Sequence, residues 1–187
     1  ELLDPKWKGK ISLQDPRQSA GNAHMSVLLK RFGEDFVREL LAKQAPAITK
    51  DARQQLEWTI RNNYPIGIAV DETEVHSMQA QGLPFNVKPV LDAASLSTGA
   101  GGVNIINRAP HPNAAKVFVN WLLSRDTQAK VASITKSNSR RLDVPPVDPS
   151  SAADPAHIDD YLPFANQRED FLPYKQQMLK LSNELIK

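Results

Sequence analysis

The chain has 187 residues, of which 24% are charged and 41% hydrophobic, and its formal net charge is +2. These values are typical of a globular protein with a sizeable core, and they exclude a peptide or a linker. Lysines and arginines are interleaved with acids, so no basic stripe stands out and we expect no nucleic-acid partner. The chain contains no cysteine, which excludes disulfides and thiolate sites. No apolar run approaches the roughly 18 residues of a membrane helix.

The first 60 residues predict one strand followed by helices. A short strand is expected at 9–14, where Asp15 and Pro16 end it. Apolar residues at helical spacing predict one helix that stops at Gly33 and another that follows it: Met25, Leu28, Leu29 and Phe32, then Phe36, Val37, Leu40 and Leu41. Thr49 is expected to cap a further helix, whose charged positions Arg53, Glu57 and Arg61 form a solvated face.

The next segment alternates strand and helix. Residues 62–65 break the preceding helix, and the apolar run 66–70 predicts a buried strand. A short helix should begin at Asp71 and end near Gly82. A further strand is expected at 85–91, at an edge or bent because Pro89 interrupts it. This alternation predicts an α/β fold and argues against an all-helical bundle.

Residues 101–130 predict a strand, a turn and two helices. Val103, Ile105 and Ile106 form a short apolar strand, and prolines 110 and 112 force a turn after it. Asn113 is expected to cap the first helix, and Ser124 to start a second that fades near residue 134. The first helix has an apolar side made of Ala114, Val117, Phe118, Trp121 and Leu122.

The rest of the chain predicts a connector and a terminal helix. Residues 136–156 are rich in proline, serine and aspartate, as in surface connectors. From Arg168 onward an apolar stripe indicates an amphipathic helix that begins near Pro173 or bends there and needs a partner surface. The stripe consists of Phe171, Tyr174, Met178, Leu181 and Leu185.

Motifs for catalysis, cofactors and metals do not stand out in this sequence. The four histidines lack HExxH or other short metal-binding spacings, so no metal site is predicted. The glycine-rich run 98–102 lacks the pattern of a phosphate loop and precedes a strand, which favours either close backbone approach or a flexible turn. GxSxG is absent, so no serine nucleophile is indicated. We therefore predict no enzyme activity and no cofactor.

The best candidate site is the run DPRQSAGN at 15–22, where a strand ends and a helix begins. Free backbone N–H groups at a helix N-terminus attract anions. Arg17 could add a bidentate contact and Ser19 a hydrogen bond, with Gly21 and Asn22 beside them. The alternative is a capped helix in which Ser19 or Asn22 satisfies its own backbone and Arg17 points into solvent.

Two acids form a second candidate. Asp71 and Glu72 follow the strand predicted at 66–70, at the carboxyl end where open α/β sheets bind ligands. They could meet an amine or a hard cation. The alternative is that they only stabilise the first turn of a helix.

Three stretches occur in an order that resembles a known family. They are LLDPKWKGKI with the following DPRQSAG, then NNYPIGIAV, and then GGVNIINRAPHPNAAKVFVNWLLSRDTQ. Together they resemble the family 1 extracellular solute-binding proteins of bacterial ABC importers, in the branch that includes ferric-ion binders. The resemblance implies a type II periplasmic binding fold of two α/β lobes. Such a protein closes on a small solute or ion and delivers it to a membrane permease without catalysis, in the periplasm or outside the cell.

The ligand does not follow from the resemblance. Ferric-ion binders of this branch carry adjacent tyrosines just after the strand that corresponds to 66–70, whereas this chain has Asp71, Glu72 and Thr73 there. Tyr64 precedes that strand, and Tyr161 and Tyr174 lie far along the chain, which argues against tyrosinate iron binding. An organic anion, a phosphorylated or phosphonate compound, and an amine-bearing solute all remain open.

Length also sets this chain apart, because family members are much longer. The resemblance implies a C-terminal portion with a second-lobe segment at 1–87, a returning first-lobe segment at 88–135, and a connector with C-terminal helices at 136–187. The first residues, ELLDP, lack the regions of a signal peptide. An orphaned strand near 103–107 would expose an edge, which we expect a second copy to cover by dimerisation or exchange of elements. The alternative function is a structural or protein-interaction domain without a small ligand.

Overall fold

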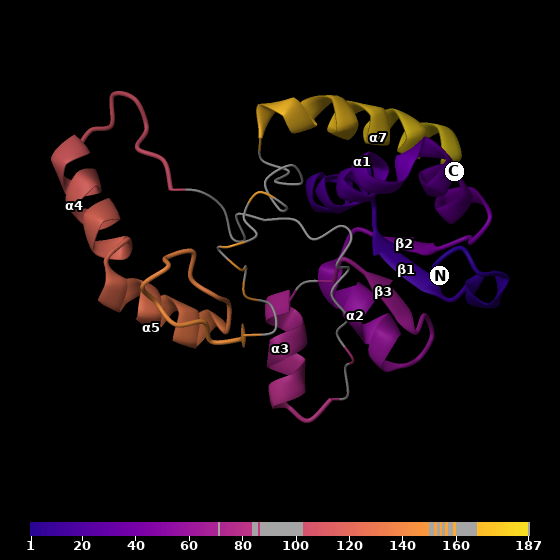
Figure 1. Ribbon diagram of the computed structural model, residues 1–187, viewed down its shortest axis with the longest axis horizontal. Helices are drawn as coiled ribbons and strands as arrows, with labels where there is room; N and C mark the ends of the chain where they lie inside the picture. The colour runs from indigo at the N-terminus through magenta and orange to yellow at the C-terminus, as the bar shows by residue number, and fades with distance from the viewer. Residues whose placement is uncertain are drawn as a thin grey trace. The chain divides into compact units, whose positions relative to one another are not determined.

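The computed structural model describes residues 1–70, 72–83, 86, 103–149, 152, 154, 156, 159 and 168–186 (Figure 1). By residue contacts the chain divides into two compact units. The first comprises Glu1–Ser97 with Asp159–Lys187, and the second comprises Thr98–Ile158. The predicted strand at 85–91 lies outside the described residues, apart from Asn86.

A parallel sheet organises the first unit. Its strands are β1 (Ile11–Gln14), β2 (Ala47–Thr49) and β3 (Ile66–Ile68), in the order β2-β1-β3. Leu13 of the central strand is in register with Ile48 on one side and Ile68 on the other. β1 is buried throughout its first three residues, as expected of a parallel strand covered on both faces. β3 is only half-buried, so the expectation of a buried strand there is wrong.

The sequence predicted β1 and β3 but not β2. β2 lies between Pro46 and Lys50 and lacks the longer apolar run that indicated β3, and it occupies the place where Thr49 was expected to cap a helix. That prediction is wrong because Thr49 ends the strand, and the cap is Asp51, whose carboxylate accepts hydrogen bonds from the backbone N–H groups of Arg53 and Gln54. A carboxylate at this position satisfies N–H groups that the helix itself leaves free.

Helices cover the sheet on both faces (Figure 1). A short 3-10 turn, η1 (Pro5–Trp7), precedes β1, and α1 (Ser19–Ala42) follows it. Gly33 interrupts α1 with φ 85° and ψ 174°, which glycine adopts readily, so the predicted stop divides it into two helical segments. The chain moves to one side of β1 for β2 and to the other side for β3. Right-handed crossovers, the rule for parallel strands, then put α1 and α2 (Ala52–Ile60) on opposite faces of the sheet. α3 (Glu72–Ala80) follows β3, and the chain turns at Gly82 as predicted.

The terminal helix α7 packs along α1. It spans Leu172–Leu185, after the 3-10 turn η6 (Glu169–Phe171), and Pro173 lies in its first turn as expected. Buried residues of η6 and α7 join the apolar faces of β1 and α1 in one core: Phe171, Met178 and Leu181 with Ile11, Leu13, Met25, Leu28, Val37 and Leu40. At the surface the Arg38 guanidinium bridges Glu34 of α1 and Glu184 of α7 at 2.7 Å each. The amphipathic stripe therefore has the partner surface that the sequence required.

The second unit holds α4 (Pro112–Leu122) and α5 (Arg125–Thr135). Ser124 caps α5 as predicted, but the prediction that Asn113 caps α4 is wrong: His111 is the N-cap residue and Pro112 takes the first helical position, which suits its fixed φ. The predicted strand at 103–107 is also wrong. Residues 103–106 are irregular and exposed, and no strand in the described part of the chain pairs with them.

The connector after α5 folds back onto its own unit. Asn138 exchanges two hydrogen bonds with the backbone of Asp148, and Arg141 forms a bidentate pair with Asp143. Arg141 also donates to the carbonyl of Leu123 at the junction of α4 and α5. This part of the predicted surface connector is therefore ordered by its polar side chains.

We expect Phe171→Ala to destabilise the first unit by about 3–5 kcal/mol, the usual cost of removing a buried phenyl ring. Phe171 is 0% exposed, and the ammonium of Lys30 lies 4.9 Å from its ring centroid. Urea denaturation followed by circular dichroism would measure the loss. Leu172→Ala is the matched control, because the neighbouring side chain is 51% exposed and should change the free energy of unfolding by less than about 1 kcal/mol. Equal losses in the two variants would contradict the packing of α7 on α1.

Candidate functional site

The order of the strands marks one edge of the sheet as the candidate site. The chain leaves β1 for β2 on one side and then returns to β3 on the other side of β1. In open α/β sheets, ligands bind at the carboxyl ends of the strands where successive connections diverge in this way. The register pairs Leu13 with Ile68, so the segments after β1 and after β3 leave the same edge of the sheet. These two segments contain all six predicted site residues.

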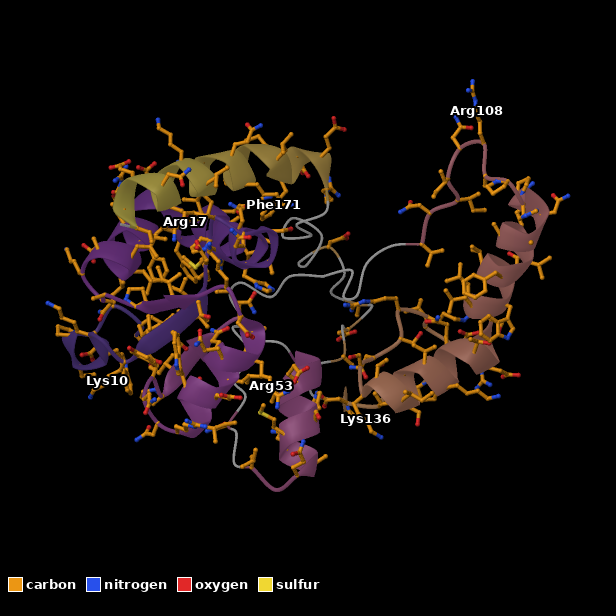
Figure 2. All side chains as sticks on the ribbon, turned by 180° about the vertical axis from the view of Figure 1, so that it is seen from behind. Lys10, Arg17, Arg53, Arg108, Lys136 and Phe171 are labelled. Atoms are coloured by element: carbon orange, nitrogen blue, oxygen red, sulfur yellow. The ribbon has the colours of Figure 1, made fainter. Side chains whose placement is uncertain are left out.

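Asp15 and Arg17 form an ion pair directly after β1, and Figure 2 labels the Arg17 side chain. The Asp15 carboxylate accepts hydrogen bonds from the backbone N–H of Arg17 at 2.9 Å and from its Nε and Nη2 at 2.8 Å each. The Asp15 side chain is 2% exposed and that of Arg17 is 33% exposed. Arg17 is therefore fixed by a buried acid instead of extending freely into solvent.

The contact between Asp15 and Arg17 shifts the pKa values of both side chains. Hydrogen bonds from the Arg17 side chain lower the pKa of Asp15, and they outweigh the burial that would raise it. The same contact raises the pKa of Arg17. Because Asp15 occupies Nε and Nη2, the guanidinium keeps the edge formed by Nη1 and Nη2 for a second acceptor. Sequence reasoning took Asp15 only as the end of a strand, although an acid two residues before an arginine in a turn is a signal for this pair.

The N-terminus of α1 has no side-chain cap. Its N-cap residue is Gln18, which makes no side-chain capping hydrogen bond. Ser19 is the first helical residue and is exposed. The backbone N–H groups of the first turn, together with the helix dipole, favour an anion at such an end. The alternative that Ser19 or Asn22 caps this helix through its side chain is wrong.

Gly21 and Asn22 hold the segment in place. A Cβ atom on Gly21 would collide with the carbonyl oxygen of Asp15, so only glycine allows α1 to approach the end of β1 this closely. The Asn22 Nδ2 atom donates to the carbonyl oxygens of Pro16 at 3.2 Å and Lys175 at 3.1 Å. The structure thus assigns both residues a supporting role, and their contact with a ligand stays a prediction.

The second candidate pair is described only in part. Asp71 lies outside the described residues, and Glu72 is the first residue of α3. Their predicted roles therefore rest on their position after β3.

Metal ligands do not cluster in the described part of the chain. There, no group of three or more histidine, cysteine, aspartate or glutamate side chains could hold a metal ion. Tyr64 packs against Trp58 at a centroid distance of 5.2 Å, and Tyr174 against Phe171 at 5.6 Å. Tyr161 lies outside the described residues. Among the helices of the described ranges, none has both the length and the apolarity to cross a bilayer.

The fold is similar to that of a solved structure. The apo structure of FutA2 from Synechocystis PCC6803 aligns with 99% of this chain and 62% of its own, with a TM-score of 0.56 and 19% sequence identity. At this identity the likeness concerns the fold alone. It confirms the predicted fold class, an α/β architecture of the periplasmic-binding-protein type.

Residues 1–133 match the family model described as bacterial extracellular solute-binding protein. The chain therefore belongs to this family, as its motifs predicted. A putative 2-aminoethylphosphonate-binding periplasmic protein of Salmonella typhi is 30% identical over 156 residues, which is 79% of this chain and 46% of the relative. Iron uptake protein A1 of Synechocystis sp. is 24% identical over 145 residues, 71% of this chain and 40% of the relative. The chain thus spans less than half the length of these relatives.

We expect Asp15→Asn to reduce stability at neutral pH by about 1.5–3 kcal/mol, the usual worth of hydrogen bonds to a charged group. Because the pKa of Asp15 is lowered in the folded state, its contribution is present above the unfolded pKa of about 3.9 and is lost as the pH falls through the folded pKa. The difference from the parent chain should therefore shrink in acid, in urea denaturation from pH 7 to pH 3.

Asp170→Asn is the control, because Asp170 also binds an arginine two residues away but is 54% exposed. It should lose much less stability. Equal losses in the two variants, or a loss from Asp15→Asn that persists in acid, would contradict this account of the pair.

Proposed function

We propose that this chain forms part of the binding site of an extracellular solute-binding protein, which delivers a small solute to an ABC permease and catalyses no reaction. The observation that carries the proposal is the uncapped N-terminus of α1 beside Arg17, at the switch point of the sheet. Membership of the family supports it. The names of its relatives support a location in the periplasm or outside the cell.

The site favours a solute with an anionic group. The α1 backbone N–H groups and the Ser19 hydroxyl can donate to its oxygens, and the outer edge of Arg17 can form a bidentate contact. The buried Asp15 carboxylate neutralises the Arg17 charge, so directed hydrogen bonds, more than net charge, would select the ligand. Phosphonate and phosphate groups, with three acceptor oxygens, match this set of donors.

The acids after β3 suggest the second half of the ligand. Asp71 and Glu72 follow a strand adjacent to β1, where they could accept hydrogen bonds from an ammonium group. The relative named for 2-aminoethylphosphonate binding supports a solute that carries both a phosphonate and an amine. Ferric ion is the second candidate, which the relative named iron uptake protein A1 supports. It would need hard oxygen ligands, which here could come from Asp71 and Glu72.

The order of segments along the chain fits a two-lobed protein. We propose that residues 1–87 belong to its second lobe, that 88–135 return to the first lobe, and that 136–187 connect the lobes and cover them with C-terminal helices. The division of the chain into two compact units supports a change of lobe between α3 and α4.

We expect Ser19→Asp to weaken binding of 2-aminoethylphosphonate by about tenfold or more, because a second negative charge within a few ångströms of the ligand costs on the order of 1–3 kcal/mol. The same acid favours the helix dipole, so the melting temperature should stay level or rise. Isothermal titration calorimetry with 2-aminoethylphosphonate, ethylphosphonate and ethanolamine separates the contributions of the two ligand groups. Ser133→Asp is the matched control, because it adds the same charge at an exposed position in α5.

Arg17→Lys provides a second test of the anion site. It keeps the charge and loses the planar fork, so affinity for the phosphonate should fall. Arg17→Ala is less informative because it leaves the buried Asp15 carboxylate without its partner. If the parent chain binds none of the probes, or if Ser19→Asp binds the phosphonate probes as tightly as the parent chain, the anion site is excluded. A chain that binds no solute would instead favour the structural or protein-interaction alternative.

A second copy is the proposed partner for the second unit. Large apolar side chains of α4 and of the preceding segment are exposed: Val117 at 70%, Phe118 at 53%, Trp121 at 57% and Ile106 at 78%. Figure 2 shows Arg108 on the turn that links this segment to α4. Exposed apolar clusters of this kind mark interaction surfaces. We propose that dimerisation, or exchange of elements between two copies, covers this face.

We expect the parent chain to be dimeric at micromolar concentration and the double variant Phe118→Lys/Trp121→Lys to be monomeric, because charged side chains would lose hydration on burial. Light scattering coupled to size-exclusion chromatography, with native mass spectrometry, measures both. Leu142→Lys is the control, since Leu142 is 84% exposed and lies outside α4. A monomeric parent chain would overturn the proposal.

A further inference from the structure

We propose that Asn22 is a positioning residue through which the C-terminal helix α7 holds the segment between β1 and α1 in its binding shape. The proposal rests on the proposed function for its effect on affinity, but the geometry that supports it is independent of any ligand. Asn22 lies in the first turn of α1, and Lys175 lies 153 residues further along the chain in α7. One side chain therefore joins the candidate site to the last helix.

Both the nitrogen and the oxygen of the Asn22 carboxamide contact other groups of the protein. Nδ2 donates to the carbonyl oxygens of Pro16 and Lys175, and an amide nitrogen has two hydrogens to give. The buried hydroxyl of Ser26 lies 2.6 Å from the Asn22 carbonyl oxygen and 3.3 Å from Oδ1. A flipped amide would place Oδ1 against two carbonyl oxygens, so these contacts fix its orientation.

The contact with Pro16 bears directly on Arg17. The Pro16 carbonyl and the Arg17 N–H belong to the same planar peptide group. Asn22 holds this group at its oxygen, while the Asp15 carboxylate accepts from its N–H at 2.9 Å. A peptide plane held at both ends sets the direction in which the Arg17 side chain leaves the backbone. Asn22 therefore acts on the candidate site through Arg17.

Helix α7 offers a firm platform for this contact. Met178 and Leu181 are almost fully buried against α1 and β1. Gln177 donates to Glu34 at 2.8 Å, and Arg38 binds Glu184, so α7 is also tied to α1 by contacts far from the segment after β1. These contacts fix the position of α7 on α1. The hydrogen bond from Asn22 to Lys175 then fixes the segment that carries Arg17 and Ser19 relative to α7.

The test uses two readouts on the unliganded and liganded chain. In the free protein, Asn22→Ala should speed hydrogen exchange of the Arg17 and Gln18 amides by about tenfold, since these N–H groups bond to the Asp15 carboxylate and carbonyl. Affinity for 2-aminoethylphosphonate should fall by a similar factor. Gln177→Ala, which removes a contact between α1 and α7 without touching this segment, should leave both readouts unchanged.

The outcomes separate this inference from the proposed function. Faster exchange in Asn22→Ala supports positioning even if the parent chain binds none of the probes, in which case only the proposed function fails. Unchanged exchange overturns the positioning role whatever the affinities are. If Asn22→Ala does not fold, Asn22→Ser keeps one donor and should give an intermediate rate. If Gln177→Ala speeds the exchange of the Arg17 and Gln18 amides equally, the proposal is also overturned, because any loosening of α7 would then have the same effect as loss of the Asn22 side chain.

Discussion

The first unit depends on how closely the start of α1 approaches the end of β1. The position of Gly21 against the Asp15 carbonyl leaves no room for a side-chain carbon. This contact allows the chain to turn from strand to helix within four residues, so that the buried Asp15 meets Arg17 and the helix N-terminus lies beside them. Without it, α1 would have to shift, and its core contacts with α7 would shift as well. The packing of this unit and the geometry of the candidate site therefore share one constraint.

Much of this architecture could be predicted from local sequence patterns. The break at Gly33, the cap at Ser124 and the amphipathic α7 follow from residues within a few positions of each element. β2 was missed because Pro46 and Lys50 flank its three residues, which leaves it without an apolar run like the one at 66–70 that indicated β3. The strand expected at 103–107 failed for the opposite reason. Its composition suits a strand, but composition supplies no partner for its backbone hydrogen bonds.

The candidate site, too, could be predicted from the sequence only in part. Position in the sequence indicated that Arg17 and Ser19 lie where a strand meets a helix, and the structure places them there. It could not indicate that Arg17 is already engaged by Asp15, or that the Asn22 amide contacts a helix 153 residues away. Those contacts depend on tertiary packing, which gives neighbouring polar residues different tasks. Ser19 stays exposed, while Asn22 donates to the protein's own carbonyl groups.

The pairing of α1 with α7 also has a consequence for biosynthesis. β1, α1, β2 and α2 leave the ribosome early, yet the apolar face of α1 is covered only when Phe171, Met178 and Leu181 have been made. The second unit, Thr98–Ile158, is synthesised in between. The first unit must therefore wait with an uncovered core face while roughly a hundred residues emerge, at a translation rate of about 5–20 residues per second.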